Sequence, residues 1–150
     1  MLKLDHDPAN YECHTDIKVI FRDIDAFGHV NNAVYFTYLE NSRVEYIQGM
    51  GLAIDKASDY DFILAHVELD YLRPLVFPDT VAVHTRVSHL GGKSFEFEYL
   101  LVSGKNGEPV AFGKSVQVCF DFETQKPVAI PEKLRGLMEK ARTSREMPAL

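Results

Sequence analysis

Residues 31–49 read NNAVYFTYLENSRVEYIQG, and their larger side chains recur at the spacing of an α-helix. Two adjacent stripes would run along this helix, Phe36, Leu39, Arg43 and Ile47 on one and Tyr35, Tyr38, Ser42 and Tyr46 on the other. Because the stripes together span much of the circumference, the pattern predicts a helix that is buried on most sides. Asn31 or Asn32 would cap its amino end, and the run Gly49–Gly51 would end it.

Alternating segments lie on both sides of this helix in the sequence. Before it, residues 15–22 place Ile17, Val19 and Phe21 on one side, as in a half-buried strand. After it come four more strand-like segments, at about 62–72, 80–90, 93–103 and 109–122. For three of these the apolar faces are expected to be Ile63, Ala65, Val67, Leu69 and Tyr71; Val81, Val83, Thr85 and Val87; and Phe95, Phe97, Tyr99 and Leu101. Such regular alternation predicts an antiparallel sheet with one apolar face.

The turns and the last segment complete the predicted architecture. Gly91-Gly92 and Asn106-Gly107 offer the positive φ values of tight hairpins, so consecutive strands should pair. Residues 131–142 have the spacing of a short helix, and residues 143–150 are expected to fray. The sequence therefore predicts an α+β fold in a single domain over residues 1–150, with five strands wrapped around one long helix and a short C-terminal helix.

Composition and charge exclude several classes of function. The chain has 150 residues and a formal net charge of −6, which disfavours nucleic acid as a partner because phosphate binding requires a basic face. The first seven residues lack the apolar core of a signal peptide, and no run is long enough to span a membrane, so a cytoplasmic location is expected. Cys13 and Cys119 are expected to be reduced thiols, and the six histidines show no metal-ligand spacing. Neither a metal nor a cofactor is expected.

The segment between the first strand and the helix, residues 22–32, reads RDIDAFGHVNN and carries the chemistry. A helix amino terminus offers unpaired N–H groups and a partial positive charge, which stabilise an oxygen that becomes negative during a reaction. A carboxylate a few residues upstream would then reach the carbonyl carbon or the water that attacks it. Without further information, a loop carboxylate that merely caps the turn or the helix is the simpler reading of Asp25.

Residues 25–43 resemble the hotdog thioesterases of the 4-hydroxybenzoyl-coenzyme A thioesterase type. They are similar to that family's Asp-x-x-Gly-x-Val-x-x-x-x-Tyr pattern, which is followed by an acidic residue and an arginine on the helix. Residues 69–75, LDYLRPL, and 91–95, GGKSF, resemble two further parts of the family in the same order. The resemblance implies hydrolysis of acyl-coenzyme A thioesters by a homodimer, or a dimer of dimers, with each active site at the subunit interface.

The resemblance also implies roles for individual residues. Asp25 would be the nucleophile or the general base, and the backbone N–H near Asn32 would bind the oxyanion. His29 would donate to the substrate carbonyl or carry a proton, with a packed histidine as the equal alternative. The residues expected to bind substrate are Gly28, Val30, Asn31, Tyr35, Arg73, Arg86, Lys93 and Ser94, of which Arg73, Arg86 and Lys93 would hold the coenzyme A phosphates. Asp23 is expected to be structural.

Departures from the pattern leave other functions open. Ala26 and His29 stand where the 4-hydroxybenzoyl enzymes have proline and a bulky apolar residue, and the sequence here is more like the aliphatic acyl-coenzyme A and acyl-carrier-protein branches. The alternatives are an acyl-carrier-protein thioesterase and a non-catalytic acyl-coenzyme A-binding hotdog protein. A hotdog hydratase is disfavoured because its Asp and His have a different spacing from Asp25 and His29.

Overall fold

The computed structural model describes residues 5–54 and 61–145 of the chain. Its long elements are β1 (Cys13–Lys18), α1 (Val34–Gly49), β2 (Phe62–Tyr71), β3 (Thr80–Leu90), β4 (Ser94–Ser103), β5 (Pro109–Asp121) and α2 (Glu132–Ser144). Shorter ones are the 3-10 turns η1 (Pro8–Asn10) and η2 (Phe21–Asp23) and the two-residue strand β6 (Lys126–Pro127).

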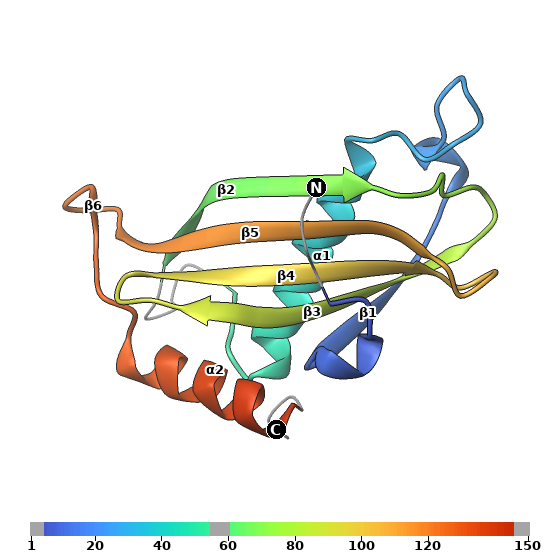
Figure 1. The fold of residues 1–150 in the computed structure, drawn as a ribbon. Helices are drawn as coiled ribbons and strands as arrows, with labels where there is room; N and C mark the ends of the chain where they lie inside the picture. The colour runs from blue at the N-terminus through green and yellow to red at the C-terminus, as the bar shows by residue number, and fades with distance from the viewer. Residues whose placement is uncertain (1–4, 55–60, 146–150) are drawn as a thin grey trace.

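The strands form one antiparallel sheet in the order β1-β3-β4-β5-β2, with β6 added to β5. The strands β3, β4 and β5 follow one another as a meander, and β1 and β2 lie at the two edges. Figure 1 shows α1 behind the curved sheet, crossing its strands. The predicted α+β architecture, five strands around a long helix with a shorter helix at the end, is confirmed.

The main core lies between α1 and the inner face of the sheet. Leu39, Tyr46 and Ile47 of the helix have no exposed surface, and the inner residues of β3 and β4 are equally buried. The helix approaches β5 closely at Gly113, where a Cβ atom would lie 3.0 Å from the Glu68 carbonyl oxygen and 3.5 Å from Leu39 Cδ1. The long helix therefore packs one face against the sheet. The prediction of burial on most sides was wrong, because a second face is exposed: Phe36, Thr37, Glu40, Asn41, Glu45 and Gln48.

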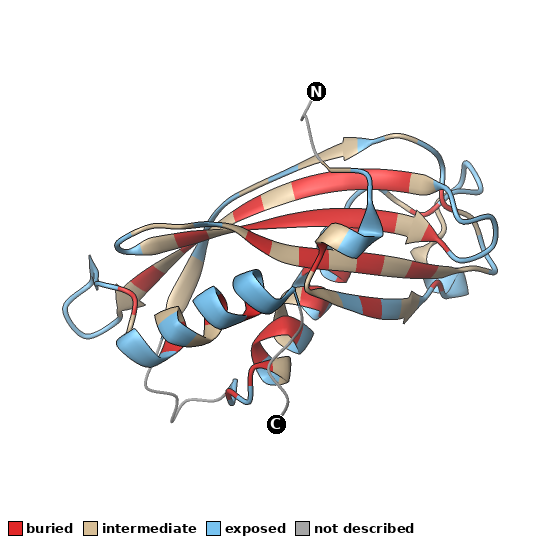
Figure 2. Ribbon diagram, turned by 60° about the horizontal axis from the view of Figure 1, so that its bottom comes forward, coloured by how far each residue is buried: buried red, intermediate tan, exposed pale blue. Residues whose placement is uncertain are grey.

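The outer face of the sheet has a second, smaller apolar cluster. Residues 5–11 lie against this face, where Tyr11 packs on Leu100 and Phe112, which are both buried. Helix α2 lies against β3. It buries Leu134, Met138 and Ala141 and exposes its other side to solvent, as Figure 2 shows. The two faces of the sheet thus have different covers, the long helix on the inside and the N-terminal segment over part of the outside.

Two predictions, one about β1 and one about β2, need correction. The alternation over 15–22 does not extend to Phe21, which belongs to η2 and is 78% exposed. In β2 the pairing with β5 shifts between Leu64 and His66, so a β-bulge inserts one extra residue. Ile63 and Ala65 consequently do not share the face of Val67, because the bulge moves them out of phase with it; Leu64 lies there instead, beside Val67 in one pocket.

Three other boundaries and turns also differ from expectation. The helix begins at Val34 rather than Asn31, although Asn31 still accepts from an orphan amide near the helix start. Positive φ is found at Gly107 but not at Gly91 or Gly92, so the β3–β4 hairpin turns without it. Helix α2 continues to Ser144, two residues into the expected frayed tail, whose last residues, 146–150, lie outside the described part of the chain.

Candidate active site

Residues 24–30 form a small hairpin that projects beyond the sheet (Figure 1). Ile24 and Val30 form an isolated antiparallel bridge, and the Asp25 N–H donates to the His29 carbonyl over 2.9 Å. At the tip, the Gly28 N–H donates to the Asp25 carbonyl over 3.0 Å, with Gly28 at φ +82°. A residue with a side chain would be strained in this left-handed conformation, which explains the glycine.

Asp23 ties the base of this hairpin to α1. Its Oδ2 accepts from the buried Tyr38 hydroxyl at 2.7 Å and from the Ile20 N–H at 3.0 Å. Its backbone carbonyl accepts from the Asn31 N–H at 2.8 Å. Burial, followed by the hydrogen bond to Asp23, raises the pKa of Tyr38, so its hydroxyl stays protonated and donates. Asp23 therefore has the structural role that was expected of it.

Asn31 organises the start of the helix. Its side-chain Oδ1 accepts from the Ala33 N–H at 2.9 Å, and its carbonyl accepts from the Val34 N–H at 3.0 Å. These bonds satisfy two of the amides that open a helix. Within residues 5–54 and 61–145, the Asn32 N–H has no acceptor, and the Asn32 carbonyl accepts from the Tyr71 hydroxyl at 2.9 Å.

An open pocket of about 440 Å³ lies at this end of α1. It is lined by Asp25, Phe27, His29, Val30, Asn32, Tyr35, Tyr71, Leu72, Arg73 and Pro74. Asp25 keeps one oxygen in a local turn, because Oδ1 accepts from the Phe27 N–H at 2.8 Å, while Oδ2 has no partner among the described residues. Asp25, with one carboxylate oxygen unpaired, and Asn32, with an open amide, thus line the same pocket.

Two tyrosines form the inner wall of the pocket. The rings of Tyr35 and Tyr71 meet edge to face, with centroids 5.0 Å apart and planes at 89°. Burial raises the pKa of Tyr35, and it also raises the pKa of Tyr71 despite the opposing effect of its hydrogen bond to Asn32. Both phenols are therefore protonated at neutral pH and act as hydrogen-bond donors rather than as bases.

The structure brings only part of the expected site together in one chain. Asp25, His29, Val30, Asn32, Tyr35 and Arg73 line the pocket. Gly28 and Asn31 shape the adjoining backbone without lining it. These placements are geometric, and the roles assigned to the residues stay predictions.

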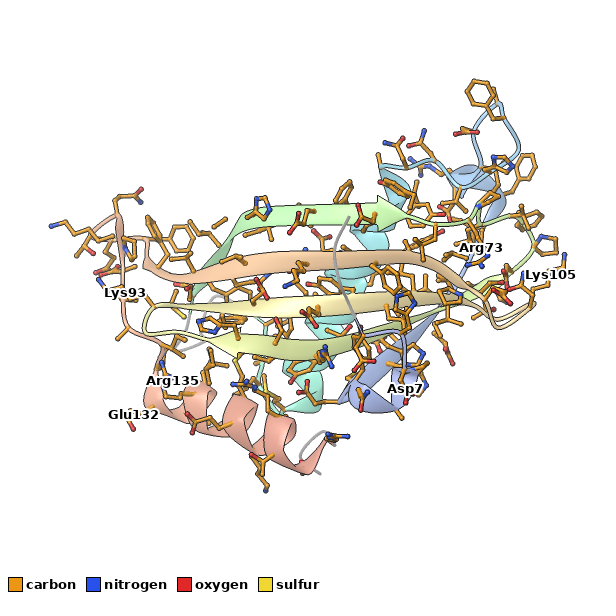
Figure 3. All side chains as sticks on the ribbon, viewed as in Figure 1. Asp7, Arg73, Lys93, Lys105, Glu132 and Arg135 are labelled. Atoms are coloured by element: carbon orange, nitrogen blue, oxygen red, sulfur yellow. The ribbon has the colours of Figure 1, made fainter. Side chains whose placement is uncertain are left out.

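The three cations expected to hold phosphates lie in different places. Arg73 is exposed at the pocket, where it pairs with Glu108 at 3.2 Å. Figure 3 shows Arg73 at one end of the sheet and Lys93, with Ser94 next to it in the chain, at the other. Arg86 is on the outer face, 2.6 Å from Glu98 and over the Tyr11 ring, so its charge is already neutralised within the chain.

Four residues of the pocket were missed as site residues by sequence reasoning. They are Phe27, Tyr71, Leu72 and Pro74. Phe27 lay inside the recognised motif, and the other three lay inside the second matching segment, residues 69–75. The order of the two segments in the chain gave no sign that they would meet, because the contact depends on how β2 ends beside the start of α1.

Comparison with known proteins identifies the family. Residues 19–137 match the thioesterase-like superfamily. The chain belongs to this superfamily. That match spans well over half of the chain, and a thioester hydrolase is the class of enzyme that it supports.

Individual relatives are consistent with the family. The chain is 30% identical over 126 residues to the long-chain acyl-CoA thioesterase FadM of Escherichia coli, covering 83% of this chain and 96% of that protein. It is 32% identical over 123 residues to the chloroplastic acyl-acyl carrier protein thioesterase ATL3 of Arabidopsis thaliana, covering 81% of this chain but only 64% of that one. A thioesterase of Thermus thermophilus, solved with coenzyme A and Zn, superposes with a TM-score of 0.79 at 34% identity, covering 89% of this chain and 96% of that chain.

Two further features of the structure bear on the class of protein. In the described ranges, no helix is both long and apolar enough to cross a membrane. Nor do the described His, Cys, Asp and Glu side chains form any group of three that would hold a metal ion.

The contrast between the two aspartates predicts different effects on stability. Asp23→Ala should lower the free energy of unfolding by about 1–3 kcal/mol, because the buried Tyr38 hydroxyl loses its acceptor. Asp25→Ala removes one local bond to an exposed amide and should cost less than about 1 kcal/mol. Urea unfolding followed by circular dichroism measures both; equal losses would contradict the separation of structural and functional roles.

Proposed function

We propose that this protein hydrolyses acyl-coenzyme A thioesters to the free acid and coenzyme A in the pocket at the amino end of α1. The observation that carries the proposal is that Asp25 and Asn32 line the same pocket, with the Asp25 Oδ2 and the Asn32 N–H both unengaged in the described chain. The thioester carbonyl carbon would lie near Asp25, and its oxygen would accept from the Asn32 N–H.

Two routes fit this arrangement. As a nucleophile, Asp25 forms a mixed anhydride with the acyl group, coenzyme A leaves as a thiolate, and water then cleaves the anhydride. As a general base, Asp25 takes a proton from a water molecule that attacks the same carbon directly. Both routes pass through a tetrahedral centre with a negative oxygen, so both use the amide in the same way.

The comparisons support the substrate class. FadM is named as a long-chain acyl-CoA thioesterase, and the Thermus structure is a complex with coenzyme A. In this chain, Arg73 is the expected phosphate ligand that lies at the pocket, and Phe27, Leu72 and Pro74 provide apolar surface for an acyl group. A cytoplasmic location is part of the same proposal and rests on the sequence argument.

Removal of the carboxylate tests the proposal. Asp25→Asn and Asp25→Ala should each lower the rate of free-thiol release from acyl-coenzyme A by about 10²–10⁴-fold. Thiol release is followed with a thiol-reactive dye across short, medium, long and aromatic acyl groups, which also defines the preferred substrate. Asp16→Asn alters an exposed carboxylate of β1 outside the pocket and serves as the matched control.

The outcome is decisive in both directions. Near-normal turnover in both Asp25 variants would remove Asp25 from the mechanism. Binding of acyl-coenzyme A without thiol release by the unaltered protein would favour the non-catalytic binding protein instead.

We further propose that the protein is a homodimer that pairs through β2. Among the described strands, β2 is hydrogen-bonded to β5 alone, so one edge of a ten-residue strand is left open. Exposed apolar side chains lie beside this edge, Leu64 at 47% and Phe36 of α1 at 37%, and both line a small pocket of about 180 Å³ between the two elements. An open edge with apolar neighbours is a typical surface for strand pairing.

Pairing about a two-fold axis would complete the site. Two β2 strands related by a two-fold axis run antiparallel, so opposite ends of the two sheets lie on the same side. The end of the partner's sheet that carries residues 91–94 would then face the same side as this chain's Asp25. Lys93 and Ser94 would then reach the site from the partner subunit, although in one chain Lys93 and Arg73 lie at opposite ends of the sheet.

A charged side chain at the proposed β2 interface should separate the subunits. Leu64→Lys should shift the particle mass from twice the chain mass of 17.0 kDa to a single chain, with a fall in thiol release because each site loses its second half. Light scattering coupled to size exclusion measures the mass. Val128→Lys, at a similarly exposed apolar position outside this interface, should remain dimeric; a dimeric Leu64→Lys protein would place the interface elsewhere.

The similarity to ATL3 supports one alternative carrier. That relative is named for acyl-acyl carrier protein, although this chain spans only 64% of it. With the same acyl group on both carriers, the present proposal predicts a higher kcat/KM for the coenzyme A thioester than for the carrier-protein thioester. The reverse order in the same thiol-release assay would assign the carrier protein as the substrate.

A further inference from the structure

We propose that Tyr71 is a positioning residue that orients the Asn32 amide toward the substrate. The inference rests on the proposed function, because it concerns the amide that would hold the oxyanion. Its basis is the hydrogen bond of 2.9 Å from the Tyr71 hydroxyl to the Asn32 carbonyl, which joins the end of β2 to the start of α1.

The backbone of Asn32 is fixed from both sides. On its amino side, the preceding peptide is held because the Asn31 carbonyl accepts from Val34 and the Asn31 N–H donates to Asp23. On its carboxyl side, the first turn of the helix leaves the Asn32 carbonyl free, because the Phe36 N–H donates to Ala33 instead, over 3.2 Å. The Tyr71 hydroxyl donates to that carbonyl, and the N–H of the same peptide, that of Ala33, donates to Asn31 Oδ1, so this peptide is held at both edges. With the peptides before and after it held, rotation about the Asn32 Cα is restricted and its N–H keeps one direction.

The hydroxyl is itself held in place. Tyr71 is the last residue of β2, where it pairs with Ala111 of β5, and its ring packs edge-on against the buried Tyr35. A group on a regular strand with a packed ring offers a more precise anchor than a loop side chain. The hydrogen bond from Tyr71 therefore fixes the segment before α1 relative to the end of β2.

A purely structural role does not account for this hydrogen bond. Tyr71 is 45% exposed and Asn32 is also exposed, so water would satisfy the carbonyl if the hydroxyl were absent. An exposed hydrogen bond of this kind contributes little to folding stability. What water does not supply is a fixed direction, and an oxyanion donor must lie about 2.7–3.1 Å from the oxygen that develops charge.

The hypothesis predicts a selective loss in the chemical step. Tyr71→Phe keeps the ring and its contact with Tyr35 but removes the hydroxyl. Loss of a whole oxyanion donor costs about 10²–10³-fold, and a misdirected donor should cost less, so kcat should fall about tenfold with KM for acyl-coenzyme A within about twofold of the original. The melting temperature should stay nearly unchanged, and the Asn32 amide signal should shift in a ¹H–¹⁵N spectrum.

Tyr11→Phe is a matched control. The Tyr11 hydroxyl also donates to a backbone carbonyl, that of Asp5, at 2.8 Å, but it lies on the outer face of the sheet. This variant should keep the original kcat and leave the Asn32 amide signal in place.

Each other outcome overturns the inference. An unchanged kcat in Tyr71→Phe would do so, and so would a higher KM with the original kcat, which would make Tyr71 a binding residue. Equal losses in the two variants would make the effect one of stability. Absence of thiol release by the unaltered protein is a distinct result: it rejects the proposed function itself, and this role of Tyr71 with it.

Discussion

The structure depends on the burial of one face of α1 against the sheet. That face consists of Tyr35, Tyr38, Leu39, Ser42, Tyr46 and Ile47, whereas Thr37, Glu40, Asn41, Glu45 and Gln48 are exposed. The strands curve around this face of α1, and β1 and β2 are the two edges of the sheet. Gly113 of β5 lies under the helix, where a Cβ atom would be crowded chiefly by the Glu68 carbonyl oxygen of the neighbouring strand β2, at 3.0 Å. The wrap is incomplete beside β2, and that opening is where a second chain would fit.

The amino end of the same helix concentrates the chemistry. A buried helix still needs partners for its first amides, and the preceding loop divides this work among similar residues. Asp23 and Asn31 direct their oxygens inward, to Tyr38 and to the first turn. Asp25 and Asn32, each one or two positions away, line the pocket, and the Asp25 Oδ2 and the Asn32 N–H have no partner among the described residues. The two aspartates are the same residue type, and it is their hydrogen bonds in the structure that distinguish them.

Much of this arrangement could be predicted from periodicity and motif, and the failures have identifiable causes. Strands β3, β4 and β5 are long apolar segments separated by clear turn residues, so their bounds were predicted to within a residue, although their pairing also shifts, between Val87 and His89 and between Leu101 and Val102. The bulge in β2 arises from its pairing with β5, and a non-local contact leaves no trace in the alternation of β2 itself. The exposed Phe21 follows the apolar alternation of its neighbours, and only the turn of η2 takes it out of the strand.

In the candidate site, too, some residues could be predicted from the sequence and others could not. The motif placed Asp25 and Asn32 together because they belong to one continuous segment. Arg86 was chosen for its charge, but its position in β3 points it to the outer face and to Glu98. Tyr71 was assigned to the apolar face of a strand, since nothing in residues 69–75 reveals that β2 ends beside the helix start.

The N-terminal segment over the outer face limits how larger assemblies can form. Bare sheets often stack face to face in oligomers, with side chains of the two layers interdigitated. Here Tyr11 occupies the space above Leu100 and Phe112, and η1 belongs to the same N-terminal segment. Two copies could stack through that area only if this segment were first displaced. Its displacement would expose the apolar side chains of Leu100 and Phe112 to water. Any tetramer built from such dimers would therefore grow through surfaces that leave this segment undisturbed.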